Sequence, residues 1–145
     1  MSDAVALPPK LAEIVADFEL MEGREKLELL LEYANRFTPF PAHLVLPGNI
    51  EDVPECMTPV QMAAEMKGDK LYFYFDVPEE SPTVRGYASL IMEGINGCTP
   101  GEVISIPAEF YFRMGLQDVL TPQRLNGMAA ILAHVKRKAS KELYG

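Results

Sequence analysis

The spacing of apolar residues predicts two amphipathic helices near the N-terminus. The first carries its apolar stripe almost to Gly23, and the second follows after a short connection, so we expect a helical hairpin. The stripes comprise Leu11, Ile14, Val15, Phe18 and Met21, then Leu27, Leu30, Leu31 and Ala34. Opposite the second stripe we expect Glu25, Lys26, Glu28 and Glu32 to face water.

Two later segments alternate strictly between apolar and other residues. Residues 60–66 alternate at Val60, Met62, Ala64 and Met66, and residues 71–77 alternate at Leu71, Phe73, Phe75 and Val77. Lys67, Gly68, Asp69 and Lys70 lie between them and have the composition of a tight turn. The pattern therefore predicts an antiparallel hairpin.

Helix starts are marked by a hydroxyl residue followed by proline, at Ser81-Pro82, Thr99-Pro100 and Thr121-Pro122. Thr99 also has Glu102 three residues on, which is the spacing of a capping box. The helix predicted from residue 122 has the longest apolar stripe, comprising Leu125, Met128, Ala129, Leu132 and Val135. Two N-terminal helices, a small sheet and C-terminal helices make an α+β fold.

Between the second helix and the hairpin, residues 36–59 carry five prolines and no regular period. This segment is too apolar for a free linker, so we expect an ordered loop anchored by Phe37 and Phe40, with a short extended piece around 42–45. Its last part, residues 49–60, holds Cys56 between Pro54 and Pro59, in a stretch too polar for a core. The pattern predicts an exposed thiol at the mouth of the sheet.

Composition limits the chain to one domain and restricts its partners. With 145 residues, 48% of them hydrophobic, residues 1–145 suffice for a single core. The net charge of −8 disfavours nucleic-acid binding, and the basic run 136–138 complements a helix C-terminus. The N-terminal residues do not resemble a secretory signal, and no stretch is long enough to span a membrane. We therefore expect a cytoplasmic protein with Cys56 and Cys98 as free thiols.

Of the two cysteines, Cys56 is the better candidate for chemistry. Its neighbours Glu51, Asp52 and Glu55 are acidic, so they disfavour the thiolate and help must come from elsewhere in the fold or from a partner. Cys98 precedes a predicted helix start, where backbone N–H groups favour a thiolate but an apolar residue often packs back on the helix. We interpret Cys98 as structural.

The remaining candidate residues form no familiar catalytic or metal motif. His43 and His134 lack an evident orienting partner, and His134 falls on the polar side of its helix, so neither is assigned as the base of a cysteine hydrolase. The cysteines and histidines lack the paired spacing of zinc sites, and an iron–sulfur scaffold needs more thiolates. We predict no metal site and no bound cofactor.

Arg85 is unusual because it lies in the first turn of a predicted helix, where a cation opposes the helix dipole. Two interpretations stay open. Its side chain is either solvated or paired with Glu79 or Glu80, or it is a cation reserved for a nearby carboxylate or thiolate.

Three segments in this order resemble the SufE family of sulfur-acceptor proteins. They are Val53-Pro54-Glu55-Cys56, Thr83-Val84-Arg85-Gly86, and the run Leu120-Thr121-Pro122-Gln123-Arg124-Leu125-Asn126-Gly127-Met128 with Ala129-Ala130-Ile131-Leu132. The resemblance extends from about Pro8 to the C-terminus. It implies a curved sheet flanked by helices, as in iron–sulfur scaffold proteins of the IscU type.

The resemblance also implies a function. A protein of this family accepts persulfide sulfur from a pyridoxal-phosphate-dependent cysteine desulfurase of the SufS type, stimulates that enzyme, and passes the sulfur to an iron–sulfur scaffold. Cys56 matches the accepting cysteine, and Arg85 matches an arginine with an electrostatic or docking role. The alternatives are a binding module that regulates a desulfurase allosterically without carrying sulfur, and an independent thiol enzyme. A homodimer is compatible with the sequence.

Overall fold

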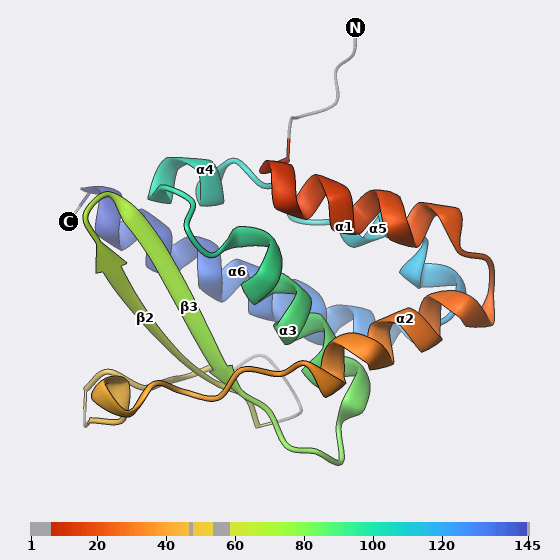
Figure 1. Ribbon diagram of the computed structural model, residues 1–145, viewed down its shortest axis with the longest axis horizontal. Coiled ribbons are helices and arrows are strands. Elements are labelled where there is room, and N and C mark those ends of the chain that lie inside the picture. The colour runs from red at the N-terminus through yellow and green to blue at the C-terminus, as the bar shows by residue number, and fades with distance from the viewer. Residues whose placement is uncertain (1–6, 47, 54–58, 145) are drawn as a thin grey trace, which may run out of the picture.

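The computed structural model describes residues 7–46, 48–53 and 59–144. Its elements follow the predicted order of helices, sheet and helices (Figure 1). They are α1 (Pro9–Leu20), α2 (Arg24–Asn35), η1 (Ala42–Leu44), β1 (Glu51–Asp52), β2 (Gln61–Lys67), β3 (Lys70–Asp76), α3 (Pro82–Ile95), α4 (Pro100–Ile104), α5 (Tyr111–Met114), η2 (Leu116–Asp118) and α6 (Pro122–Tyr144). The α+β fold class is confirmed.

Strands β2 and β3 form the predicted hairpin, and their register explains the alternation. Met62 lies opposite Phe75 and Ala64 lies opposite Phe73, so the apolar residues of both strands share one face. The structure adds β1, which the sequence pattern did not predict, and β1 pairs with β2 to give an antiparallel sheet of order β1-β2-β3. Strand β1 is therefore an edge of this sheet.

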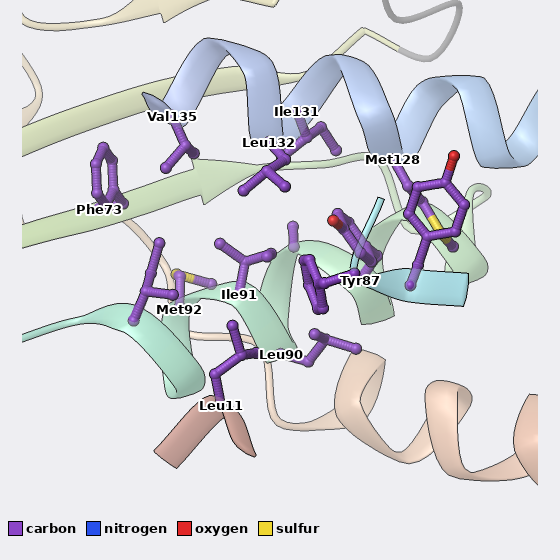
Figure 2. Packing of buried hydrophobic residues seen from close by; sticks show 14 of the residues in the cluster. Leu11, Phe73, Tyr87, Leu90, Ile91, Met92, Met128, Ile131, Leu132 and Val135 are labelled. Atoms are coloured by element: carbon purple, nitrogen blue, oxygen red, sulfur yellow. The ribbon is translucent and has the colours of Figure 1, made fainter. Parts of the chain in front are cut away.

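Helix α3 lies at the centre of the fold and is buried on most of its surface. In Figure 2, Ile91 of α3 lies on the side of Leu132 of α6, whereas Leu90 lies on the opposite side, near Leu11 of α1. Phe73 of β3 belongs to the same core. The first two helices are consecutive, as predicted, but both pack mainly on α3. They serve as the cover of α3 rather than as an independent hairpin.

Helix α2 buries a different face from the one we predicted. Lys26, expected in water, is 8% exposed, and the buried face comprises Lys26, Leu30 and Tyr33. The Nζ atom of Lys26 donates to the backbone oxygens of Phe18 at 2.6 Å and of Met114 at 2.9 Å. These carbonyls belong to the last turns of α1 and α5, where helices leave acceptors unpaired and where a cation is favoured. A charged residue therefore joins three helices.

Residues that follow α3 form hydrogen bonds with backbone groups on the outer edge of β3. Asn96 accepts a hydrogen bond from the backbone N–H of Phe73 at 2.8 Å and donates to its carbonyl at 2.9 Å. Next to it, the backbone N–H of Leu71 donates to the Cys98 carbonyl at 2.8 Å. The side chain of Asn96 thus substitutes for a neighbouring strand, a role that no local sequence pattern indicates.

The helix starts were predicted correctly, with α3, α4 and α6 beginning at residues 82, 100 and 122. Thr99 and Glu102 form the expected capping box. Thr121 accepts from the backbone N–H of Arg124 at 3.3 Å, whereas the Ser81 side chain makes no capping hydrogen bond. The predicted extended piece at 42–45 is wrong, because residues 42–44 form one turn of 3₁₀ helix.

Candidate functional site

Two hydrogen-bonded valines bracket the segment that contains Cys56. Cys56 itself lies outside the described residues. On either side of it, the backbone N–H of Val53 donates to the carbonyl of Val60 at 2.9 Å, and both valine side chains are buried. Asp52 lies opposite Gln61 where β1 meets β2. Both ends of the connection that carries Cys56 are therefore fixed on the sheet.

Arg85 lies in the first turn of α3, where its guanidinium packs on an aromatic ring. The guanidinium carbon is 4.2 Å from the centroid of Phe37, and one N–H donates to the backbone oxygen of Val77. No described carboxylate forms an ion pair with Arg85, so the pairing with Glu79 or Glu80 that one of the two interpretations allowed is not seen within the residues described. This geometry holds the cation by stacking on an aromatic ring, and no carboxylate of the described residues engages its five donors.

A surface hollow of about 430 Å³ lies against this arginine. Its lining comprises Phe37, Pro39, Phe40, Phe75, Asp76 and Arg85. Phe37 packs on the core as predicted, and Phe40 is half-buried in the wall of the hollow. Asp76 lies opposite Gln61, and Gln61 lies opposite Asp52, so the hollow is at the end of the sheet from which the Cys56 connection leaves. The fold thus brings Arg85 and the described residues on either side of the Cys56 segment to one end of the sheet.

The second and third motif segments touch each other. Arg124, at the start of α6, donates to the hydroxyl of Thr83 at 2.6 Å. Thr83 is buried, and Arg85 follows it by two residues on α3. Neither Arg124 nor Thr83 is a candidate site residue from the sequence alone. The only sequence signal that relates them is that each belongs to one of the motif segments.

Cys98, the other cysteine, is a half-buried thiol at the edge of the core. Burial raises the pKa of the Cys98 thiol above its ordinary value, the nearby Glu102 raises it further, and Lys70 opposes this effect. Its packing immediately before the Thr99 cap agrees with the structural interpretation. Its environment keeps it protonated rather than activating it.

We expect Cys98 to react slowly with iodoacetamide. In a Cys56→Ser protein, the alkylation rate of Cys98 at pH 8 is expected to be several-fold below its rate in the same protein unfolded in urea. The raised pKa leaves less thiolate at this pH, so the difference should narrow as pH rises through the folded-state pKa. Mass spectrometry of quenched samples measures both rates, and equal rates at pH 8 would contradict an unreactive Cys98.

Both histidines have carboxylate partners that the sequence did not reveal. His43 Nε2 lies 2.8 Å from Glu65 Oε1, although no polar partner for His43 was evident. His134 Nε2 lies 3.1 Å from Glu51 Oε1, and its side chain is 13% exposed rather than on a fully polar face. Neither pair includes Cys98. Within the described ranges, no group of three or more histidine, cysteine, aspartate or glutamate side chains is arranged to hold a metal ion.

The described helices were compared with the length and hydrophobicity that a membrane-spanning helix needs. None of them is both long enough and apolar enough to cross a bilayer.

Comparison with known proteins agrees with this fold and with the motif segments. The SufE family, described as an Fe-S metabolism associated domain, matches residues 12–139. The chain therefore belongs to the SufE family.

Individual relatives match over nearly the whole chain. An uncharacterised SufE-like protein of Mycobacterium tuberculosis is 37% identical over 139 residues, which cover 95% of this chain and 96% of that protein. An uncharacterised SufE-like protein of Synechocystis is 31% identical, covering 92% of this chain and 82% of the relative. The solution structure of a hypothetical protein from Thermus thermophilus superposes with a TM-score of 0.83 at 37% identity, covering 97% of this chain and all of that one.

Proposed function

We propose that this protein is a sulfur acceptor and carrier that receives persulfide sulfur on Cys56 from a pyridoxal-phosphate-dependent cysteine desulfurase. The protein would stimulate the desulfurase and pass the sulfur to an iron–sulfur scaffold. The observation that carries this proposal is that the chain belongs to the SufE family and that its segment containing Cys56 starts and ends at Val53 and Val60, which are hydrogen bonded to each other. A cysteine on a short connection at the end of a sheet is suited to entering another protein's active site.

The proposed transfer conserves atoms and charge. The thiolate of Cys56 attacks the terminal sulfur of a persulfide on the desulfurase, and a new sulfur–sulfur bond forms as the donor's bond breaks. The desulfurase cysteine leaves as a thiolate, so no external oxidant or reductant is needed. The pyridoxal phosphate belongs to the donor enzyme, and the chain described here would act without a cofactor.

The charges near Cys56 suggest why a partner is needed. The acidic neighbours in its sequence disfavour a thiolate in the isolated protein, so an acceptor of this kind would react slowly until it docks. Arg85 lies at the same end of the sheet and keeps donors that no described carboxylate engages. We propose that Arg85 stabilises negative charge on the transferring sulfur or on the docked partner.

The proposal is tested by following the sulfur. The protein is mixed with a cysteine desulfurase, pyridoxal phosphate and cysteine, and its intact mass is then measured. We expect a gain of one or more sulfur atoms that a reductant removes, and peptide mapping should place them on Cys56. A Cys98→Ser protein serves as the matched control and should gain the same mass. Sulfur found on Cys98 alone, or an unchanged mass with the cognate enzyme turning over, would contradict the carrier function.

A further inference from the structure

Glu51 of β1 makes contacts that are unusual for an edge strand. Strand side chains alternate, so Glu51 shares its face with Val53, which is 3% exposed, rather than with the outward-facing Asp52. Its two carboxylate oxygens have different partners on α6. Oε1 lies 3.1 Å from His134 Nε2, and Oε2 lies 3.4 Å from Lys138 Nζ. We call this arrangement of Glu51, His134 and Lys138 the strand latch.

The contact between Arg137 and His134 indicates which ring nitrogen of His134 carries the proton and donates to Glu51. Its guanidinium lies 3.2 Å from His134 Nδ1 and has no acceptor atom, so Nδ1 must accept that hydrogen bond. The proton of the imidazole is then on Nε2, from which it donates to Glu51. His134 and Lys138 are four residues apart and therefore lie on the same face of α6, which is why both reach one carboxylate.

Within the described part of the chain, few contacts other than the strand latch hold strand β1. It consists of two residues, joined to β2 by the pairs Glu51 with Met62 and Asp52 with Gln61 and by the bond from Val53 to Val60. So short an edge strand is marginal without support from other parts of the fold. Among the described residues, its further supports are the buried Val53, the Gln61 amide that donates to Asp52, and the two side chains of α6. Cys56 follows Glu51 by five residues, so any movement of β1 displaces one end of the connection that carries it.

We propose that His134 and Lys138 are positioning residues that hold β1 through Glu51 and thereby keep the Cys56 connection ready to dock with the sulfur donor. The proposal rests on the proposed function. A connection whose ends are already fixed loses less conformational entropy on docking, so a broken latch weakens docking more than it slows chemistry within the complex.

The charges around Glu51 fit a latch that is closed at neutral pH. Partial burial opposes ionisation, but the positive charge of Lys138 and the hydrogen bonds from Lys138 and His134 outweigh it and hold the pKa of Glu51 below its usual value. The groups that face Glu51 from α6 are His134, Lys138 and, through His134, Arg137, while the neighbouring Asp52 accepts a hydrogen bond from Gln61. The latch is therefore strongest above the ordinary pKa of glutamate and is lost as pH falls through the lowered folded-state value.

The test uses charge reversal and rescue. In Glu51→Lys, two cations face each other; in Glu51→Lys with Lys138→Glu, a pair of opposite charge is restored. We expect Glu51→Lys to raise amide exchange of Val53 about tenfold or more, with Phe73 unchanged, and to raise the concentration of protein that half-saturates desulfurase stimulation about five- to tenfold. Maximal stimulation should stay near that of the unaltered protein. The double variant restores the charge pair but not the hydrogen bond from His134, so it should recover part of the change in both measurements.

Two further variants keep the test decisive. Glu51→Gln preserves shape and should show a smaller change in the same direction if Glu51→Lys does not fold. Glu28→Lys reverses a charge in an exposed ion pair with Arg24 on α2 and should alter neither measurement. Unchanged Val53 exchange in both Glu51 variants, unchanged half-saturation despite faster exchange, or no rescue by the double variant would each overturn the positioning role.

Failure of the carrier function is distinguishable from failure of the latch. Cys56→Ser is measured beside these variants by the same exchange and stimulation assays. If Cys56→Ser still stimulates the desulfurase, the carrier function fails, but Val53 exchange and half-saturation still report on β1. If Cys56→Ser is inactive and Glu51→Lys matches the unaltered protein in both assays, only the latch fails.

Discussion

Replacing Cys56 by serine is expected to lower desulfurase turnover in the presence of this protein to that of the desulfurase alone. A serine hydroxyl stays protonated near neutral pH and is a poor nucleophile toward sulfur, so it neither attacks the donor's persulfide nor carries sulfane sulfur. Turnover is measured as sulfide released in the presence of a reductant, over a range of concentrations of the carrier. The expected effect is a complete loss of stimulation at every concentration.

Cys98→Ser is the matched control, because it removes the only other thiol of the chain. Its stimulation should equal that of the unaltered protein, since burial keeps Cys98 protonated and its role is packing. Stimulation retained by Cys56→Ser would instead favour a binding module that activates the desulfurase allosterically. Loss of stimulation in both variants, with both folded, would assign Cys98 a part in sulfur transfer.

Gly86→Ala is expected to destabilise the fold by about 3 kcal/mol, because α2 crosses α3 in contact with this glycine. A Cβ atom at Gly86 would lie 2.2 Å from the backbone oxygen of Leu30 and 3.1 Å from its carbonyl carbon. A backbone atom within a helix cannot rotate away, so one of the two helices must shift. The higher intrinsic helix propensity of alanine offsets only about 1 kcal/mol of this cost.

Chemical denaturation and a thermal melt measure the effect, and we expect a melting temperature lower by roughly 6 to 12 °C. Gly101→Ala is the matched control, because a Cβ there meets no atom within 4 Å and the residue also lies in a helix. That variant should be as stable as the unaltered protein or up to about 1 kcal/mol more stable. Equal stability of Gly86→Ala and Gly101→Ala would show that α2 can shift away from α3 with little loss of folding free energy.

Local sequence patterns predicted most of the helices and strands, because such patterns depend only on residues that are close together in the chain. The alternation in residues 60–66 and 71–77 predicted the hairpin of β2 and β3. The proline after each hydroxyl residue predicted where α3, α4 and α6 begin. Capping and alternation depend on residues only a few positions apart, so they are readable without the fold.

Long-range contacts account for what the patterns missed. Lys26 is buried because two carbonyls meet at its ammonium group: that of Phe18 in the preceding helix and that of Met114, 88 residues further along the chain. Strand β1 is only two residues long, too short to show a period, and its pairing depends on β2. Asn96 acts as a strand neighbour only because α3 returns the chain to the edge of β3.

Some features of the candidate site were likewise evident from the sequence, and others only from the fold. Sequence motifs selected Cys56 and Arg85, and they suggested a protein of the SufE family, which the comparisons show. They did not indicate that Arg85 stacks on Phe37, that Arg124 binds Thr83, or that His134 and Lys138 hold Glu51. Each of these contacts joins residues more than 40 positions apart in the chain.

By itself, the sequence determined the family, the α+β class, the starts of the longer helices, the β2–β3 hairpin and the cysteine proposed to carry sulfur, because these depend on residue type and short spacing. The tertiary structure alone decided which charged groups are buried and which segments meet at the end of the sheet that leads to Cys56. The physical reason is that a charge enters the interior only where distant groups supply its hydrogen bonds and counter-charge, and only the folded chain brings those groups together.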